Sequence, residues 1–124
     1  MSLGRFDRTL PLPSSGNFTV QGPFDPEANV DKALIIFQIV QGEGASTVLV
    51  DGAGTWTKGN SEWSGEASPD GAHHDGSAGQ LQRGRARGIA LAVVIKPGQL
   101  FDNNTKFDPP AIETLTWCAD FTFE

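Results

Sequence analysis

The clearest pattern of hydrophobic and polar positions lies at the C-terminal end of the chain. From Ala111 to Glu124 the odd positions are mostly apolar, and the even positions carry polar side chains such as Thr114, Thr116 and Asp120. Successive side chains of a β-strand point to opposite faces of a sheet, so this alternation is typical of a strand with one buried face. The segment is therefore expected to form a half-buried strand.

Two longer segments predict further strands. Lys32–Gly42 is rich in β-branched residues and is apolar at both odd and even positions, which is typical of a central strand that is covered on both sides. Gln80–Ile95 is long enough for a bent strand that ends before Pro97. Shorter strands are expected at Phe18–Gly22 and Ser46–Val50, because a turn signal follows each of them.

The glycine–asparagine pair Gly59–Asn60 predicts a tight hairpin turn. With these two residues at the centre of the turn, Trp56 lies directly opposite Trp63 on the neighbouring strand. A second turn is expected at Asp51–Gly54, which would set Leu49 opposite Trp56. The three apolar residues then form one stripe across a three-stranded meander, and we expect this stripe to face the core.

Together these segments predict an all-β fold, specifically an antiparallel two-sheet β-sandwich, Ig-like or jelly-roll, of about seven to eight strands. A chain of 124 residues fits one domain, so residues 1–124 are expected to form a single sandwich. Residues 1–3 are interpreted as a remnant of cloning, and the small, polar and acidic residues 64–80 as a mobile loop. The expected core residues are Ile35, Phe37, Ile39, Leu49, Trp56, Leu91, Val93, Leu115, Trp117, Phe121 and Phe123.

Composition narrows the range of partners and compartments. The formal net charge of −6, from 9 basic and 15 acidic residues, makes nucleic acids and membranes poor partners. The longest clean apolar run, Ile89–Ile95, is far shorter than the roughly 20 residues of a membrane-spanning helix. Cys118 is the only cysteine, which excludes an intrachain disulfide and a thiolate cluster. The single cysteine and the lack of a recognisable signal peptide slightly favour the cytoplasm.

The two hairpin tryptophans, Trp56 and Trp63, allow two interpretations. Exposed indoles could stack on a sugar ring, with Asp51, Asn60 and Glu62 close enough to hydrogen-bond its hydroxyl groups. Opposed aromatic residues also stabilise a hairpin by direct contact, and a sandwich must bury one face of each sheet. We therefore favour core packing for both indoles, with a ligand-binding platform or a protein interface as the alternatives.

Arg83, Arg85 and Arg87 occupy alternate positions, so a strand would place their side chains on one face. Such a row could bind a phosphate, sulfate or carboxylate group, or it could be a solvated face balanced by nearby acids. Simple alternation would put the arginines on the same face as the large apolar residues that follow them. A β-bulge at Gly84 or Gly88 is therefore predicted, because it would shift the phase and turn the apolar residues inward.

Two polar segments contain side chains that could bind metal ions. Histidine and carboxylate ligands suit a transition metal, and alternating oxygen ligands suit calcium. The candidate ligands are His73, His74 and Asp75 in the first segment and Asp25, Glu27 and Asp31 in the second. Adjacent histidines in a loop are more often unliganded and exposed to solvent, and ordinary turn chemistry explains the acidic segment equally well. No cofactor is therefore expected, and calcium is the alternative.

The chain contains no recognisable catalytic motif. The sequence therefore predicts a non-catalytic binding or assembly module that binds a ligand or a protein partner and could form a homo-oligomer. One alternative is a carbohydrate- or small-anion-binding protein that uses Trp56, Trp63, Arg83, Arg85 and Arg87. A second alternative is a small hydrolase with a site carried on loops.

Overall fold

A computed structural model describes residues 2–26, 30–95 and 112–124, without the side chains of residues 2, 3, 95, 112 and 113. The described residues form nine strands and one short 3-10 helix, η1 (Gly44–Ser46). None of them belongs to a helix with the length and apolar character needed to span a membrane. The strands are β1 (Ser2–Leu10), β2 (Phe18–Pro23), β3 (Lys32–Gln41), β4 (Val48–Thr57), β5 (Glu62–Ala67), β6 (Asp70–His73), β7 (Ala78–Gln80), β8 (Gly84–Ile95) and β9 (Ile112–Phe123).

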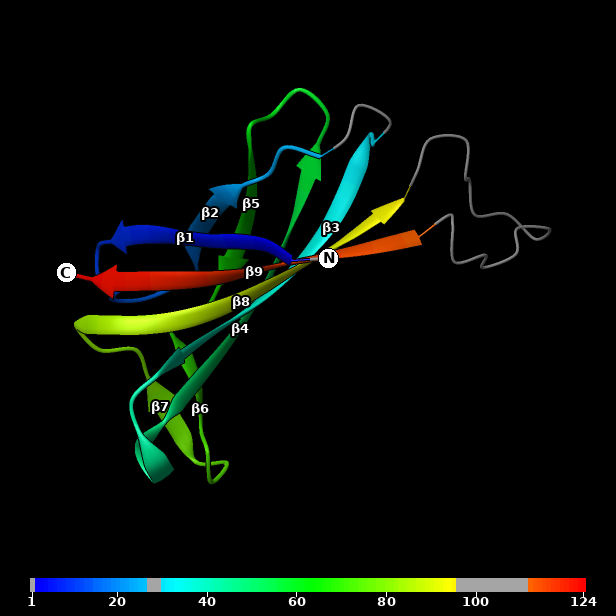
Figure 1. Cartoon of the computed structure of the whole chain (residues 1–124). Coiled ribbons are helices and arrows are strands. Elements are labelled where there is room, and N and C mark those ends of the chain that lie inside the picture. The colour runs from blue at the N-terminus through cyan, green and yellow to red at the C-terminus, as the bar shows by residue number, and fades with distance from the viewer. Residues whose placement is uncertain (1, 27–29, 96–111) are drawn as a thin grey trace.

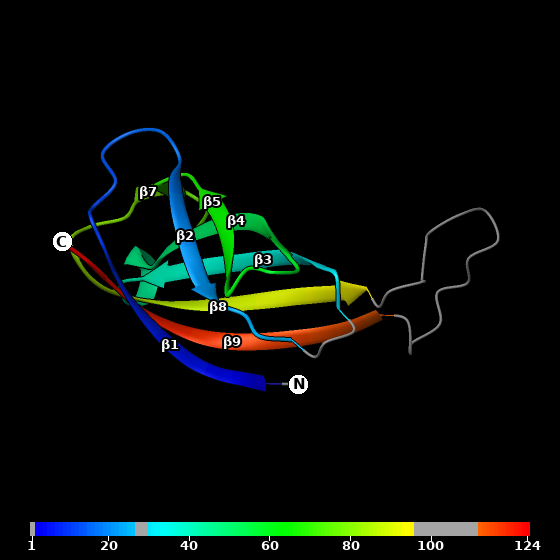
Figure 2. The same ribbon diagram turned by 90° about the horizontal axis from the view of Figure 1, so that it is seen from above.

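All nine strands belong to one sheet that curls into a nearly closed barrel (Figures 1 and 2). The main path runs β1-β9-β8-β3-β4-β5-β2, with β6 beside β4 and β7 beside β6. The sheet is mixed, because β1 runs parallel to β9 whereas the other pairs are antiparallel. The all-β prediction is confirmed, but the two-sheet antiparallel sandwich is not. One edge of β4 pairs with β3, and the other pairs with β5 and β6, so the sheet continues round the molecule.

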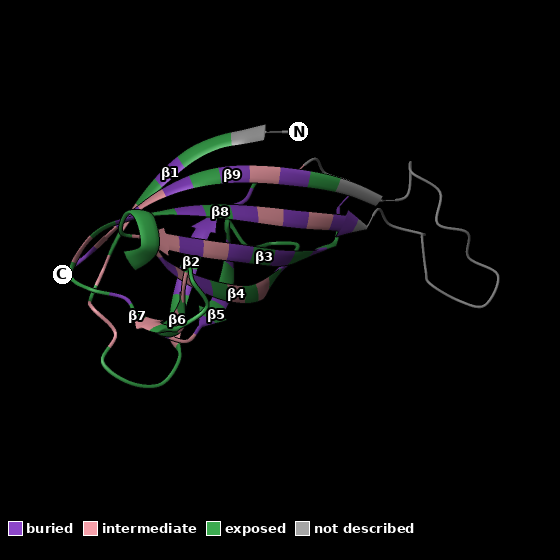
Figure 3. Cartoon of the chain, turned by 90° about the horizontal axis from the view of Figure 1, so that it is seen from below, coloured by how far each residue is buried: buried purple, intermediate pink, exposed green. Residues whose placement is uncertain are grey.

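The hydrophobic core fills the inside of the barrel, because buried and more exposed residues alternate along the strands (Figure 3). The core prediction is confirmed for eight residues, which are all buried: Ile35, Phe37, Ile39, Trp56, Leu115, Trp117, Phe121 and Phe123. It is wrong for Leu49, Leu91 and Val93, which are only partly buried and lie on the outward face.

Aromatic rings crowd the barrel interior and lie over glycines of neighbouring strands. The Phe37 ring occupies the space that a side chain at Gly52 or Gly65 would need, and the Trp63 indole does the same at Gly22. The Phe37 and Trp63 ring centroids are 5.5 Å apart. A narrow interior filled in this way leaves room only for small residues on several strands. The inward residues of β8 are Ala86, Gly88, Ala90, Ala92 and Val94.

The β4–β5 hairpin confirms the predicted register of the two tryptophans. Thr55 pairs with Ser64, and the same register sets Trp56 opposite Trp63, with both indoles buried. The expected stripe with Leu49 is wrong. Because β4 continues without a break from Val48 to Thr57, alternation places Leu49 on the outward face.

The turns of this region differ from the predictions. The amide of Asn60 donates to the carbonyl of Thr57 at 3.2 Å, so Lys58 and Gly59 are the central turn residues, and Gly59 has a φ of 102°. Asp51–Gly54 lies inside β4 and makes no turn. Its two glycines allow close packing by neighbouring groups rather than a change of chain direction.

Strand β8 contains no β-bulge, because its pairing with β3 and with β9 keeps one register throughout. The phase shift predicted at Gly84 or Gly88 is therefore wrong. Arg85 and Arg87 share the outward face with the large aliphatic residues of the strand. The physical reason lies inside the barrel, where the Phe121 ring occupies the space over Gly88 and excludes larger side chains.

Residues 64–80 do not form the structureless connection that their composition suggested. They contribute most of β5 and all of β6 and β7, and β6 pairs with β7 in a short hairpin in which Gly71 lies opposite Gly79. A side chain at Gly71 would collide with the carbonyl of Leu49 on β4. The small residues of this segment therefore permit close approach of strands.

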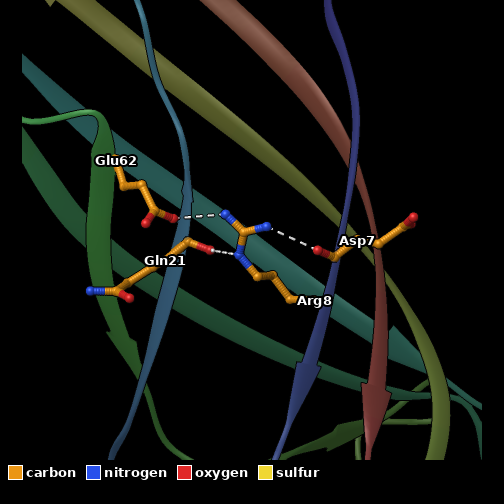
Figure 4. A network of polar contacts seen from close by, with 4 residues as sticks. All are labelled: Asp7, Arg8, Gln21 and Glu62. Carbon is orange, nitrogen blue, oxygen red and sulfur yellow. Dashed lines mark hydrogen bonds and ion pairs between the residues drawn. The ribbon is translucent and has the colours of Figure 1, made fainter.

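The barrel is open between β1 and β2, which are the two ends of the sheet path. Arg8 spans this seam (Figure 4). Its Nε donates to the carbonyl of Gln21 on β2 at 3.1 Å, and a terminal nitrogen donates to the carbonyl of Asp7 at 3.0 Å. The other terminal nitrogen lies 2.7 Å from the carboxylate of Glu62 on β5. A guanidinium group therefore connects the two ends of the sheet where backbone pairing is absent.

Replacing Arg8 with alanine should lower the free energy of unfolding by about 1–2 kcal/mol, because it removes charge-assisted bonds across the seam. Urea denaturation measures this loss. Arg5→Ala is the matched control, since its side chain is 66% exposed and pairs with Asp120 at 3.0 Å on the open surface. The control should cost less than about 0.5 kcal/mol. Equal losses at the two positions would contradict a closing role for Arg8.

Replacing Gly52 with alanine should lower the free energy of unfolding by about 2 kcal/mol, because the added methyl group meets the Phe37 ring. The cost should fall by about half in a Phe37→Leu background, where the smaller side chain leaves space, and the remainder reflects the contact of the methyl group with the carbonyl of Glu66. A double-mutant cycle by denaturant titration measures the coupling. An unchanged cost in the Phe37→Leu background would show that ring packing does not require glycine at this position.

Candidate functional site

The two hairpin tryptophans belong to the core. Trp56 is 4% exposed and Trp63 is completely buried. The indole Nε1 of Trp56 donates to the carbonyl of Asn60 at 2.8 Å, whereas Trp63 packs among Phe6, Phe37 and Trp117. Neither ring offers a face to solvent, so the pair does not form a platform for a sugar.

Trp63 stabilises the core by apolar packing and not by hydrogen bonding. Its Nε1 is buried and has no hydrogen-bond partner among the described residues. A buried donor without a partner costs about 1–3 kcal/mol. The fold tolerates that cost because the ring fills the centre of the barrel, where large apolar surface is removed from water.

The histidine segment forms the end of β6 and the following turn. His73 is partly buried, with its ring against Gly79, while His74 is exposed and its amide bonds the carbonyl of Thr47. Asp75 accepts hydrogen bonds from the hydroxyl of Ser77 at 2.6 Å and from its amide at 3.0 Å. The hydroxyl bond, followed by the amide bond, lowers the pKa of Asp75 below its usual value. The carboxylate therefore stabilises the turn.

The acidic segment is described only in part. Asp25 is exposed, Asp31 lies 3.8 Å from the ammonium group of Lys58, and Glu27 is outside the described residues. Within residues 2–26, 30–95 and 112–124, no group of three or more histidine, cysteine, aspartate or glutamate side chains is arranged to hold a metal ion.

Two of the three arginines line an open groove on the outside of the barrel. Arg85 and Arg87 contribute from β8, and the groove continues over the outward faces of β9 and β1 and along the end of β3. Arg83 is exposed but is not part of the groove. In the described part of the chain, none of the three guanidinium groups has an ion-pair partner. The groove therefore contains two cations that no described acid neutralises by direct contact.

The pairing of Asp120 explains why Arg87 is left without an ion-pair partner among the described residues. Asp120 of β9 lies opposite Arg87 in the strand register, but its carboxylate bonds Arg5 of β1 at 3.0 Å. Asp7 lies on the far side of Asp120 in the same row. The nearest acid to Arg87 in its row is thus Asp120 on the neighbouring strand, and the carboxylate of Asp120 is already paired with Arg5.

A second outward surface overlaps the groove at one end and is mostly apolar. Twelve outward residues form four cross-strand rows over β4, β3 and β8, and we call this surface the β3 face. It consists of Leu49, Asp51, Ala53 and Thr55 of β4, Val40, Gln38, Ile36 and Leu34 of β3, and Arg87, Ile89, Leu91 and Val93 of β8. Leu34, Ile36 and Ile89 are 50%, 48% and 61% exposed. The only charged members are Asp51 and Arg87, on opposite border strands.

The sequence contained the signal for this surface. Lys32–Gly42 is apolar at both odd and even positions, which predicts burial on both sides of the strand. Only the inward side is buried, so that prediction is wrong for the outward side of β3. On β8 the predicted bulge would have turned the aliphatic residues inward, so the sequence did not predict the β8 part of this exposed surface.

No protein-family model, curated protein or solved structure matches the chain. The exposed β3 face and the arginine groove are therefore the features from which a function can be inferred.

Proposed function

We propose that the protein is a non-catalytic module that binds a protein partner through the β3 face. The observation that carries the proposal is the exposure of Leu34, Ile36 and Ile89 on one continuous surface. Contiguous apolar surface exposed to water is unfavourable for an isolated domain, and larger patches mark sites of protein interaction. Burial of these side chains against a partner would remove the apolar surface from water, and this lowers the free energy of the complex.

The border of the face also resembles that of a protein interface. Such interfaces place apolar residues at the centre and polar or charged residues at the rim, and arginine is enriched in them. Arg87 and Asp51 lie at opposite borders of the β3 face, and Gln38 lies between Asp51 and Ile89 in its row. This arrangement supports a partner that combines an apolar centre with one charge of each sign.

A second candidate function is the binding of a small anion in the groove. Arg85 and Arg87 project from the same face of β8, about 7 Å apart along the strand, and neither has an ion-pair partner among the described residues. Two guanidinium groups at this spacing suit a phosphate or sulfate group.

A photoreactive phenylalanine analogue at position 36 tests the protein-binding function. Irradiation of cells of the source organism should give a covalent adduct with a protein. The adduct should disappear when Ile89 is also changed to aspartate, because a buried charge opposes an apolar contact. The matched control carries the analogue in place of Thr19, an exposed residue on β2, and should give no adduct. Equal adducts at both positions, or none at position 36, would overturn the proposal.

Titration with inorganic phosphate tests the anion site. Millimolar phosphate should shift the backbone amide resonances of β8 and β9 around the groove, and the shifts should be lost in Arg85→Gln and Arg87→Gln. Arg83→Gln is the control, because Arg83 is equally exposed but lies outside the groove. If the control loses the shifts to the same degree, binding reflects general positive charge and the site is refuted.

A further inference from the structure

The unusual property of β3 is that its sequence is suited to two buried sides, whereas the described residues cover only one. Ala33, Ile35, Phe37 and Ile39 point into the barrel and are buried. Leu34 and Ile36 point outward and are about half exposed. Strands that are apolar on both faces are typical of sheets with a layer on each side. Within residues 2–26, 30–95 and 112–124, no layer covers the outward side of β3.

We infer that this layer is the β3 face of a second copy of the chain, related by a twofold axis that runs along β3. The inference rests on the proposed protein-binding function and names the partner. Most soluble oligomers are symmetric, and a twofold interface requires a surface that is complementary to itself. The β3 face meets this requirement in both its apolar and its charged residues.

The apolar residues meet each other across such an axis. A twofold axis along β3 keeps every cross-strand row in place and exchanges the two border strands, so Ile36 faces Ile36 of the second copy and β8 lies over β4. Leu91 then faces Ala53, its counterpart in the same row on the other side of β3. In the other rows Val93 faces Thr55, Arg87 faces Leu49 and Ile89 faces Asp51. The apolar contact is therefore centred on Leu34, Ile36 and Leu91, and polar groups lie toward the Arg87 end of the face.

The charged residues are complementary about the same axis. Arg87 lies in the row of Val40 on β8, and Asp51 lies in the next row, that of Gln38, on β4. Exchange of the border strands brings each Arg87 to within one row of the other copy's Asp51, about 7 Å along the strand, a distance that an arginine side chain spans. The dimer therefore contains this pair twice.

An axis perpendicular to the strands lacks this complementarity. It would place each border strand over its own copy and reverse the order of the rows. Arg87 would then lie over β8 of the second copy, two strands away from that copy's Asp51. The charges therefore select the axis along β3.

Both charged groups are also available for such a contact. Arg87 has no ion pair with a described residue, because Asp120 is held by Arg5. Asp51 accepts one hydrogen bond, at 2.9 Å, from Gln38 to its Oδ1. Its Oδ2 accepts no hydrogen bond from a described residue and is free to accept from a guanidinium group.

The dimensions of the face predict a weak dimer. The face is about 14 Å wide across its three strands and about 23 Å long over seven residues. Its area is therefore well below the roughly 800 Å² that each partner buries in a standard interface. A contact this far below the standard size can support only weak association, so we expect a dissociation constant in the high micromolar range. The measurement must therefore cover high protein concentrations.

Sedimentation velocity of the full chain from about 5 to 500 µM tests the inference. The wild type should pass from monomer to dimer over this range. Arg87→Asp and Asp51→Arg should each weaken association at least tenfold, because each sets like charges against one another twice. Thr19→Arg, on exposed β2, is the control and should leave association unchanged. Thermal unfolding of each variant verifies that it remains folded.

Charge reversal in trans separates this dimer from other modes of association. An equimolar mixture of the Arg87→Asp and Asp51→Arg variants should form a heterodimer of wild-type affinity, because both charge pairs are then of opposite sign. The chain that carries both substitutions should likewise recover self-association. Failure of both rescues, or a wild type that stays monomeric at 500 µM, would overturn the inference. A monomeric wild type that still gives a position-36 adduct with a different protein would leave the proposed function intact.

Discussion

The interior of the barrel is narrow, and the rest of the structure depends on that constraint. Three tryptophans and five phenylalanines are buried within the described residues, and several of these rings lie directly over glycines. Once aromatic rings occupy the centre, the strands that face them can contribute only glycine and alanine at many inward positions. Ile89, Leu91 and Val93 of β8 are then left on the outside. The exposed β3 face is thus a consequence of how the core is filled.

This constraint also explains which features were predictable from the sequence. The alternation in β9 and the Trp56–Trp63 register depend on local pattern and chain reversal, and both were predicted correctly. The orientation of β8 depends on which side chains lie opposite it, far away in the sequence, and hydrophobicity alone gave Leu91 and Val93 the wrong face. The candidate site was missed for the same reason: apolar residues were assumed to point inward, so a surface made of them was not considered.

The way in which the barrel closes is not predictable from local sequence patterns. Strand β1 contains few large apolar residues, and its parallel pairing with β9 joins the two ends of the chain, so no local pattern predicts it. Parallel addition of β1 leaves it at one end of the sheet path and β2 at the other. Arg8 then supplies donors to carbonyls on both strands. Its charge prevents the exposed edges from being a simple template for another strand, a protection that open sheets need.

The two candidate functions meet at Arg87, which belongs to both the groove and the β3 face. An anion held between Arg85 and Arg87 would compete for the guanidinium group that, in the proposed dimer, contacts Asp51 of the second copy. Binding of anion and of second copy would then be negatively coupled, and by thermodynamic linkage each would weaken the other by the same factor. Phosphate would therefore shift the wild-type dimer toward monomer. It would have little effect on the doubly charge-reversed dimer, in which an aspartate replaces the arginine that the anion needs. The different phosphate response of the two dimers would show that the Arg87 side chain alone couples anion binding to dimer formation, without a change of fold.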